Sequence, residues 1–405
     1  MSNEQYDVTV IGSGPGGYVA AIRAAQVGLK TALIEKDKRL GGTCTLRGCI
    51  PTKQLLQSAS VYEHMQHAAE FGVQATGIQL AFGDVQKRKD KVVMKNSKGI
   101  EFLMKKNSIT VFKGAGKLAL PDRVEVTSDD GAKQFIQTKN IIISTGSVVR
   151  PIPGFETDGE RVVNSDHILE LKEVPKSLIV MGAGAVGVEF ASVFSRFGCE
   201  TTIVELMPRL LPLEDEEISA ELLKAFRKRK IKLQLDTKLE KLEKNDRGVV
   251  LTGKTSRGEE VRLEAEMLLV AVGRMPYTEG LGLENTKIKL ERGCIVVDGY
   301  LRTGEPNVFA IGDVIATPWL AHLASKEGIL AAEQIAGKAV QPINLRHVPS
   351  CTYCDPEVAS VGLTEQKARP KAMMCASANF LLRFRQGPHH WRRRGFCESH
   401  QRSQV

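Results

Sequence analysis

The sequence lacks any long uninterrupted run of apolar residues, and this absence argues against a membrane-spanning segment. Its most apolar stretch, residues 177–194, is broken by three glycines and carries Glu189, a pattern typical of a strand, a turn and a helix. A basic region ahead of an apolar segment is also missing at the N-terminus. We therefore expect no secretory signal and a cytoplasmic location.

An excess of one charge over the body of the chain is lacking as well. The formal net charge is +9, but residues 370–405 carry seven basic side chains against the single acid Glu398 and supply +6 of it. The first 369 residues are nearly balanced, which argues against a nucleic-acid-binding surface.

A dense pattern of cysteines is the third absence. Eight cysteines in 405 residues do not make a disulfide scaffold, so each has to be considered by itself. Hydrophobic residues at 42% and charged residues at 25% are ordinary for a globular protein, and the length allows two or three domains.

The first feature that is present is a glycine-rich turn between a predicted strand (residues 7–11) and a predicted helix (residues 18–27). Gly12, Gly14 and Gly17 give the spacing GxGxxG, which permits a tight turn, a close approach of the backbone to a pyrophosphate, and tight packing of helix on strand. A second predicted strand, residues 31–34, ends at Glu35, where a carboxylate can accept hydrogen bonds from ribose hydroxyls.

The same arrangement recurs in the middle of the chain. Residues 177–181 form the predicted strand, Gly182, Gly184 and Gly187 form the turn, and a helix is expected over 188–197. The next strand ends at Glu205. Two such units predict an α/β fold with two bound dinucleotides. Glu205 would repel a 2′-phosphate and only one base, Arg209, follows nearby, so NAD is favoured over NADP.

Two cysteines five residues apart, Cys44 and Cys49, follow the first unit directly. Residues 54–65 are predicted to be helical, so both sulfurs would lie near a helix N-terminus, which stabilises a thiolate, and Lys53 adds a positive charge. A redox pair and two packed cysteines both agree with the spacing. A zinc site would need a second pair of ligands, which does not follow, so no metal is predicted.

The segment from Gly41 to Lys53 resembles the active-site motif of the flavoprotein disulfide reductases, the pyridine-nucleotide–disulfide oxidoreductases. The ending Ile-Pro-Thr-Lys and the acid Glu205 are most similar to the dihydrolipoamide dehydrogenases within that family. Other segments match the family in order: Thr145 and Gly146 where the chain leaves the FAD domain, Gly273 where it returns, Asp313 in the second FAD motif, and Ala321 in a helix beneath the flavin.

The resemblance implies nested domains. An FAD-binding domain comprises residues 1–146 and 275–345, and an inserted Rossmann-like NAD-binding domain comprises residues 147–274. Residues 346–369 would be a fragment of an α+β dimerisation domain, whose opening strand lies within 348–362. In the family a homodimer forms through this domain, and we expect that dimer to be impaired here.

The resemblance also implies the chemistry. A small dithiol or a lipoyl-bearing protein would attack Cys44, Cys49 would pass the electrons to FAD, and the reduced flavin would give hydride to NAD. Lys53 and Glu189 match an ion pair near the reactive edge of the flavin. The other functions open to this scaffold are another flavoprotein disulfide or mercuric reductase, and a non-catalytic FAD-binding remnant.

One part of the family's machinery is missing from the sequence. The family's general base is a histidine paired with a glutamate near the C-terminus, and His389, His390 and His400 do not lie in that motif. After residue 369 the pattern is lost and basic residues accumulate, so we interpret residues 370–405 as an aberrant tail. Cys351 and Cys354 form a CxxC, for which packing is the favoured interpretation.

Overall fold

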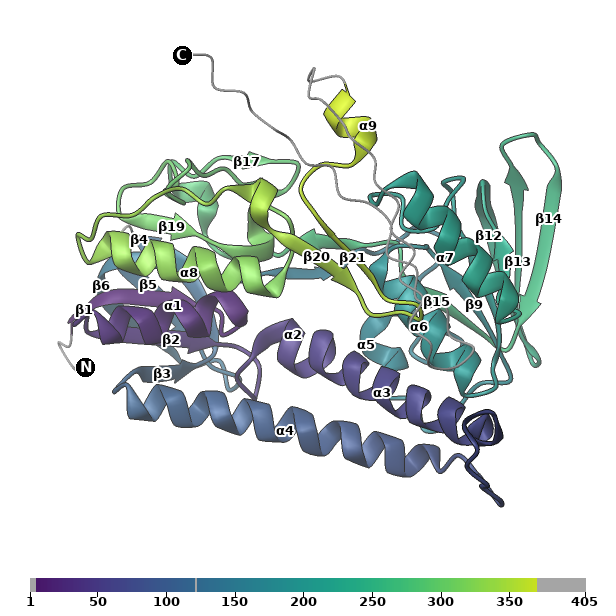
Figure 1. Cartoon of the computed structure of the whole chain (residues 1–405). Coiled ribbons are helices and arrows are strands. Elements are labelled where there is room, and N and C mark those ends of the chain that lie inside the picture. The colour runs from purple at the N-terminus through teal and green to yellow at the C-terminus, as the bar shows by residue number, and fades with distance from the viewer. Residues whose placement is uncertain (1–4, 121, 370–405) are drawn as a thin grey trace, which may run out of the picture. The chain divides into compact units, whose positions relative to one another are not determined.

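The computed structural model describes residues 5–120 and 122–369 of the chain and divides into two compact units. Of the described residues, the first unit comprises 5–51, 89–120, 122–150 and 274–345, and the second comprises 52–88, 151–273 and 346–369. Figure 1 shows the elements of both. Which cofactor each unit holds is a separate question, so the proposed division into FAD and NAD domains stays a prediction.

The first unit is built on a seven-stranded sheet of order β3-β2-β1-β6-β5-β4, with β19 also paired to β6. The strands are β1 (Gln5–Ile11), β2 (Thr31–Glu35), β3 (Thr110–Lys113), β4 (Ala115–Leu120), β5 (Arg123–Thr127), β6 (Lys133–Ile143) and β19 (Val308–Ala310). Pairs β1–β2, β1–β6, β2–β3 and β6–β19 are parallel, as expected of a dinucleotide-binding unit. The first unit also contains two separate two-stranded antiparallel sheets. One pairs β7 (Ser147–Val149) with β16 (Arg274–Pro276), and the other pairs β17 (Leu290–Glu291) with β18 (Cys294–Ile295).

The helices of the first unit include α1 (Pro15–Gln26), α2 (Gly42–Arg47) and α8 (Ala321–Ile335), with short 3₁₀ turns η2 (Leu283–Asn285) and η3 (Gly312–Val314). Helices α1 and α8 pack closely at Gly328 of α8 and Gly16 of α1. A Cβ added at Gly328 would lie only 2.5 Å from the Gly16 oxygen, so glycine is required there. The chain passes into the second unit within α3 (Cys49–Gln66) and returns within α4 (Phe82–Lys106).

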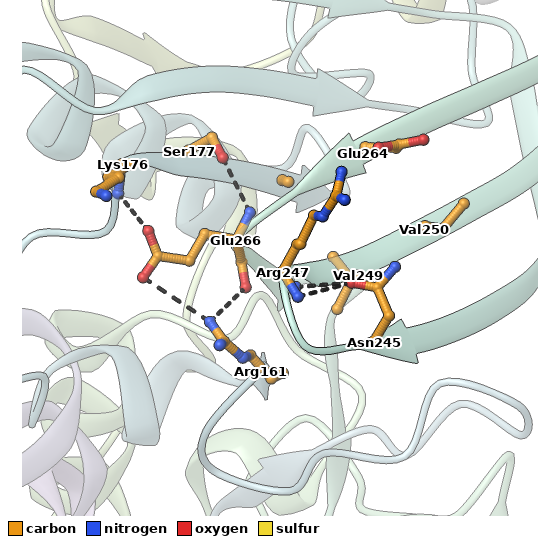
Figure 2. Close-up of a pocket in the computed structure, with 11 residues that line it drawn as sticks. Arg161, Lys176, Ser177, Asn245, Arg247, Val249, Val250, Glu264 and Glu266 are labelled. Carbon is orange, nitrogen blue, oxygen red and sulfur yellow. Dashed lines mark hydrogen bonds and ion pairs between the residues drawn. The ribbon is translucent and has the colours of Figure 1, made fainter.

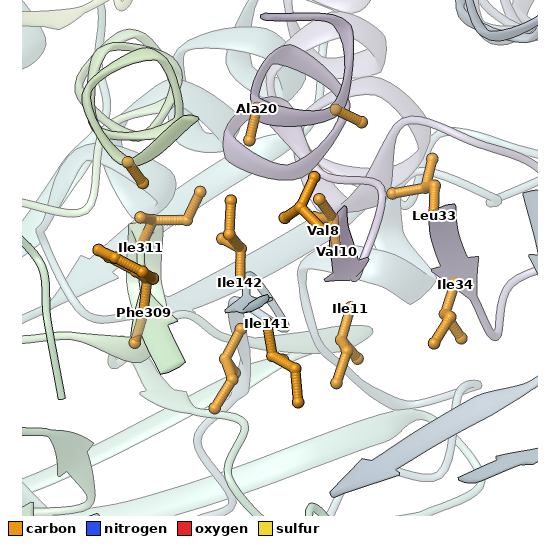
Figure 3. Packing of buried hydrophobic residues seen from close by; sticks show 14 of the residues in the cluster. Val8, Val10, Ile11, Ala20, Leu33, Ile34, Ile141, Ile142, Phe309 and Ile311 are labelled. Carbon is orange, nitrogen blue, oxygen red and sulfur yellow. The ribbon is translucent and has the colours of Figure 1, made fainter. Parts of the chain in front are cut away.

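The core of the first unit lies against the parallel strands. Figure 3 shows Val8 and Val10 of β1, Ile142 of β6 and Ile311 after β19 gathered around Ala20 of α1. Consecutive strand residues point to opposite faces, and Ile141 and Ile142 are both fully buried, so both faces of β6 are covered. This explains why residues 141–143, at the end of the strand, form a continuous apolar run in the sequence.

The second unit has a parallel sheet of order β11-β10-β9-β15-β8 and an antiparallel sheet β12-β13-β14. The strands are β8 (Val162–Val163), β9 (Ser177–Met181), β10 (Glu200–Val204), β11 (Lys232–Gln234), β12 (Thr237–Asn245), β13 (Gly248–Thr255), β14 (Glu260–Ala265) and β15 (Met267–Val270). Besides parts of α3 and α4, the helices include η1 (Ala68–Phe71), α5 (Ser165–Ile168), α6 (Ala185–Arg196), α7 (Glu216–Lys228), η4 (Leu345–His347) and α9 (Glu365–Ala368).

Strand β9 separates two apolar clusters in this unit. Leu178 and Val180 belong to a cluster with helix α6, whereas Ile179 and Met181 belong to a cluster with β13 of the antiparallel sheet. The alternation follows the two-residue period of a strand, so one parallel sheet is covered on both faces. Among the described residues no helix is both long and apolar enough to cross a membrane.

The segment expected to open the dimerisation domain differs from its prediction. Where one strand was expected, the chain makes an antiparallel hairpin of β20 (Pro349–Thr352) and β21 (Val358–Val361). The turn between them contains Asp355 and Pro356, which interrupt the apolar pattern. The predicted aberrant tail, with His389, His390 and His400, lies outside the described residues.

Candidate active site

The first glycine-rich turn has the geometry that a dinucleotide loop requires. A Cβ on Gly12, whose φ is +102°, would lie 2.3 Å from the Ser144 oxygen, and a Cβ on Gly17 would lie 1.8 Å from the Gly12 oxygen. Both positions therefore exclude a side chain. Gly14 has no atom within 4 Å of its Cβ position and caps the N-terminus of α1, so its backbone remains open to a phosphate. The loop fits the pyrophosphate of FAD, and its assignment to FAD rather than to NAD stays a prediction.

The carboxylate of Glu35 holds this loop in place. It is 5% exposed, and it accepts hydrogen bonds from the Ser13 amide at 2.8 Å and the Ser13 hydroxyl at 2.5 Å. Its other oxygen accepts the amide of Asp37 at 2.8 Å. Sequence reasoning assigned Glu35 to a ribose alone. The structure adds a loop-fixing role, and a carboxylate with about four acceptor sites has capacity left for a hydroxyl.

The second glycine-rich turn repeats the arrangement in the second unit. A Cβ on Gly182 would lie 2.5 Å from the Ala271 oxygen, and one on Gly187 would lie 1.9 Å from the Gly182 oxygen. Gly184 has no atom within 4 Å and caps α6. The two loops thus share the same three features. The first glycine makes a tight turn, the second leaves the backbone open, and the third lets the helix pack closely on the strand, as their common spacing predicts.

Glu205 repeats the role of Glu35. Its carboxylate accepts the Ala183 amide at 2.6 Å and the Met207 amide at 2.8 Å. Arg209, the one base nearby, donates to the Pro212 oxygen at 2.9 Å and pairs with Glu216 at 3.0 Å. Its guanidinium is therefore engaged elsewhere, which agrees with a site for NAD rather than NADP.

We expect Glu205→Ala to raise the KM for NADH about tenfold in a dye-reduction assay, with flavin content unchanged. The Ala183 amide would lose a charged acceptor, and such hydrogen bonds contribute about 1.5–3 kcal/mol. Glu200→Ala is the matched control, because Glu200 begins β10, the strand that Glu205 directly follows, and pairs with Lys232 on the surface. Equal KM values for the two variants would contradict this role.

The two cysteines of the predicted redox pair lie in different helices. Cys49 is the first residue of α3, and Cys44 lies within the short helix α2. The helix was expected over residues 54–65, so its start was placed five residues too late. Pro51 lies in the first turn of α3, where proline is tolerated because its missing N–H would have no helical partner.

The loop that carries Cys44 packs directly on the first glycine-rich turn. The amide of Gly41 donates to the Ser13 hydroxyl at 3.0 Å, and a Cβ on Gly42 would lie 2.5 Å from the Gly14 Cα. Tyr18 of α1 is close enough to Cys44 for a thiolate to add to the burial that raises the pKa of the tyrosine. The redox loop and the nucleotide loop are thus in backbone contact.

Lys53 and Glu189 form an ion pair in the second unit. The lysine Nζ lies 2.9 Å from both carboxylate oxygens, and the Glu189 side chain is only 7% exposed. An exposed helix charge, the alternative for Glu189, is therefore ruled out. The predicted pair exists; its place beside a flavin stays a prediction.

Thr145 and Gly146, predicted to mark the chain's exit, are both hydrogen-bonded to Tyr277, four residues after the predicted return at Gly273. Thr145 donates its hydroxyl to the Tyr277 oxygen at 2.7 Å, and the Tyr277 amide donates to the Gly146 oxygen at 2.9 Å. Gly146 has φ of +69° and Gly273 has φ of +106°, values that favour glycine. Strands β7 and β16 pair at this crossing.

Asp313 belongs to a polar group that sequence reasoning did not find. The Ser147 hydroxyl donates to its carboxylate at 2.7 Å, and Arg274 donates to that hydroxyl at 2.7 Å. Burial raises the pKa of Asp313, and the Ser147 hydrogen bond offsets part of that effect. Just before it, the Gly312 amide donates at 2.7 Å to Glu327, a buried carboxyl of α8 whose pKa burial also raises. Ala321 begins that helix.

The remaining cysteines of the described chain are structural or exposed. Cys354 is 1% exposed and its thiol donates to the Pro356 oxygen at 3.2 Å, whereas Cys351 is exposed, so packing accounts for only one half of the CxxC. Within residues 5–120 and 122–369 no cluster of three or more metal-binding side chains occurs. Burial raises the pKa of Cys199 to about 12.

We expect iodoacetamide at pH 8 to alkylate Cys351 and to leave Cys199 unmodified in the folded chain. With a pKa of about 12, only on the order of one Cys199 in 10⁴ is a thiolate at that pH. Peptide mapping by mass spectrometry measures both, and the denatured chain, in which both should react, is the control. Equal labelling of the two in the folded chain would disagree with this burial.

A separate pocket of about 420 Å³ lies in the second unit beside the antiparallel sheet. Figure 2 shows Glu266 reaching toward Arg161 and the Lys176 amide, at 3.8 Å and 2.8 Å. Its lining contains no cysteine and none of the predicted cofactor-binding residues. Because its charges partly pair with one another, we assign it no role in the chemistry.

These features define a class of protein that comparison with known families confirms. The chain matches the pyridine nucleotide-disulphide oxidoreductase family over residues 6–328 and the dimerisation domain of the same family over residues 348–386. This chain belongs to the pyridine nucleotide-disulphide oxidoreductase family. The predicted fold class, an oxidoreductase function and the cofactors FAD and NAD are thereby confirmed.

Within the family the chain is similar to dihydrolipoyl dehydrogenases. It is 42% identical to that of Zymomonas mobilis over 93% of this chain and 81% of the relative. It is 44% identical to that of Bacillus subtilis over 90% and 79%, and 42% identical to a mitochondrial one of Arabidopsis thaliana over 92% and 74%. The crystal structure of LpdA from Mycobacterium tuberculosis aligns with a TM-score of 0.85 at 28% identity, over 92% of this chain and 82% of that one.

The match to the dimerisation domain extends to residue 386, within the range that we interpreted as an aberrant tail. Residues 370–386 lie outside the described part of the chain, so that interpretation stays a prediction.

Proposed function

We propose that this chain oxidises a dithiol of the dihydrolipoamide type, free or on a lipoyl-bearing protein, and passes the electrons through Cys44, Cys49 and FAD to NAD. The observation that carries the proposal is the contact of the redox loop with the first glycine-rich turn, where Gly42 meets Gly14. A cysteine pair beside a nucleotide loop has a route for electrons that two packed cysteines lack.

The cysteine chemistry is a pair of thiol–disulfide exchanges. A substrate thiolate attacks the Cys44 sulfur of a Cys44–Cys49 disulfide, the S–S bond breaks, and Cys49 leaves as a thiolate. The second substrate thiol then displaces Cys44, so the substrate leaves as a disulfide and the protein pair holds two electrons. Because Cys49 begins α3, the helix dipole favours its thiolate.

The other residues bind and orient. FAD, when bound, would supply the two-electron chemistry that links the cysteine pair to NAD. For FAD we assign the first glycine-rich turn and the residues Glu35, Lys53, Thr145, Gly146, Asp313 and Ala321. For NAD we assign the second turn, Glu205 and Gly273. Lys53 and Glu189 would hold a fixed pair of charges at the reactive edge of the flavin. We assign no residue as the general base.

A homodimer, which we expect to be impaired in this chain, and a cytoplasmic location complete the proposal. The match to the dimerisation domain supports a second copy of the chain as partner. The relatives include one of Bacillus subtilis and one named as mitochondrial. The cellular compartment therefore differs among relatives, and a cytoplasmic location is proposed for this chain.

The test is lipoamide-dependent NAD reduction by the purified, FAD-loaded chain, with a parallel NADH–dye assay. Turnover in both assays supports the full proposal. Dye reduction alone would keep the two nucleotide sites and remove the dithiol half of the reaction. Turnover in neither, with FAD bound, would favour a non-catalytic flavin-binding protein.

A further inference from the structure

Tyr353 contacts both members of the Lys53–Glu189 ion pair, and no part of the proposed chemistry uses it. Its amide donates a hydrogen bond to Glu189 Oε1 at 2.8 Å. The Lys53 Nζ lies over its ring at 4.7 Å from the centroid. The carboxylate is therefore held by the tyrosine backbone and the ammonium by the tyrosine ring.

The turn that carries Tyr353 is itself fastened to helix α6. Glu189, Ser192 and Arg196 lie three and four residues apart and so share one face of the helix. Ser192 accepts the Asp355 amide at 3.2 Å, and Arg196 donates to the Asp355 carboxylate at 2.9 Å. This one helix face holds the turn at three successive points.

Asp355 is also part of a nearly buried charge network. The Arg196 side chain is 6% exposed, and it pairs with Glu63 of α3 at 3.5 Å as well as with Asp355. Arg229, after α7, contacts the same two carboxylates and reaches Glu63 at 2.6 Å. Breaking such a network leaves an uncompensated buried charge, so the turn has one preferred position.

We propose that Tyr353 is a positioning residue that fixes the Lys53–Glu189 pair. Without the ring, the lysine side chain keeps its carboxylate partner but loses one of the two groups that restrict the ammonium. Cation–π contacts at exposed sites shift an equilibrium about two- to fivefold. This role rests on the proposed function, in which that ammonium faces the flavin and favours its reduced form.

The first test is the midpoint potential of bound FAD in four variants. We expect Tyr353→Leu to lower the reduction equilibrium about fivefold, roughly 20 mV for a two-electron couple, and Tyr353→Phe to match the parent chain. In the background of Lys53→Met, Tyr353→Leu should add no further shift. The same shift with and without Lys53 would overturn the proposal, and so would an unchanged potential in Tyr353→Leu when Lys53→Met alone shifts the potential.

The second test needs no flavin. Brief acetylation of the full chain without FAD, read by peptide mass spectrometry and normalised to the exposed Lys91, reports how well the Lys53 ammonium is covered. Tyr353→Leu should raise its labelling rate severalfold and Tyr353→Phe should not. Tyr353→Leu could raise the labelling rate while Lys53→Met leaves the potential unchanged. That result would support the contact between Tyr353 and Lys53, but it would refute the placement of the Lys53–Glu189 pair beside the flavin. An unchanged rate refutes the role of Tyr353.

Discussion

Replacing either cysteine of the pair should abolish dithiol-dependent turnover and leave nicotinamide-dependent dye reduction intact. We expect Cys44→Ser and Cys49→Ser each to lower lipoamide-dependent NAD reduction on the order of 10³-fold or more, because a hydroxyl neither forms the disulfide nor leaves as a thiolate. NADH–dye reduction should stay within about twofold of the parent value, since neither sulfur takes part in hydride transfer between NADH and flavin.

The buried Cys354 supplies the matched control for this experiment. Its thiol contacts the Pro356 oxygen, and burial raises its pKa, so it cannot act as a nucleophile near neutral pH. Cys354→Ser should keep both activities once the variant is shown to be folded. A Cys49→Ser chain that still oxidised dihydrolipoamide would place the redox pair elsewhere.

The functions of the two glycine-rich turns should be separable by one glycine-to-alanine substitution in each turn. Gly17→Ala would place a Cβ 1.8 Å from a backbone oxygen, and Gly187→Ala would place one at 1.9 Å, so each loop has to move. Overpacking of this kind costs about 3 kcal/mol, or roughly a hundredfold in affinity. Gly17→Ala should lose FAD, whereas Gly187→Ala should keep FAD and lose the use of NADH.

Matched controls for the glycine variants exist in helix α4. Gly99 in the first unit and Gly83 in the second have no atom within 4 Å of their Cβ positions, so alanine at either should be tolerated. Flavin absorbance after gel filtration measures FAD retention, and the KM for NADH measures the second site. Retention of FAD by Gly17→Ala would contradict the assignment of the first turn.

Local sequence patterns predicted much of the fold. Strand β9 has the predicted bounds, and β2 ends at Glu35 as expected, because a buried parallel strand is a short apolar run bounded by turn residues. The glycine turns were identified because their spacing expresses a steric requirement within a few residues. The start of α3 was placed too late, although Pro51 in its first turn is compatible with a helix that begins at Cys49.

The polar contacts around the site could not be predicted in this way. The Ser147–Asp313 hydrogen bond joins residues 166 positions apart, and the contact of Tyr353 with Glu189 spans 164. No periodicity encodes such pairs, which depend on how distant strands and helices pack. Glu35 and Glu205 are intermediate cases: the sequence placed both acids at strand ends, but only the structure gives their hydrogen bonds to the Ser13 and Ala183 amides.

The central claim is that NAD, flavin and the Cys44–Cys49 pair form one electron path. The most direct test is differential alkylation of the FAD-loaded chain under anaerobic conditions, before and after addition of NADH. Electron transfer from NADH through the flavin to the cysteine pair runs opposite to the proposed reaction. It needs neither a dithiol substrate nor a general base that deprotonates one. The account predicts that Cys44 and Cys49 become alkylatable only after NADH, while Cys199 stays unmodified throughout. Oxidation of NADH with no change at the two cysteines would contradict it.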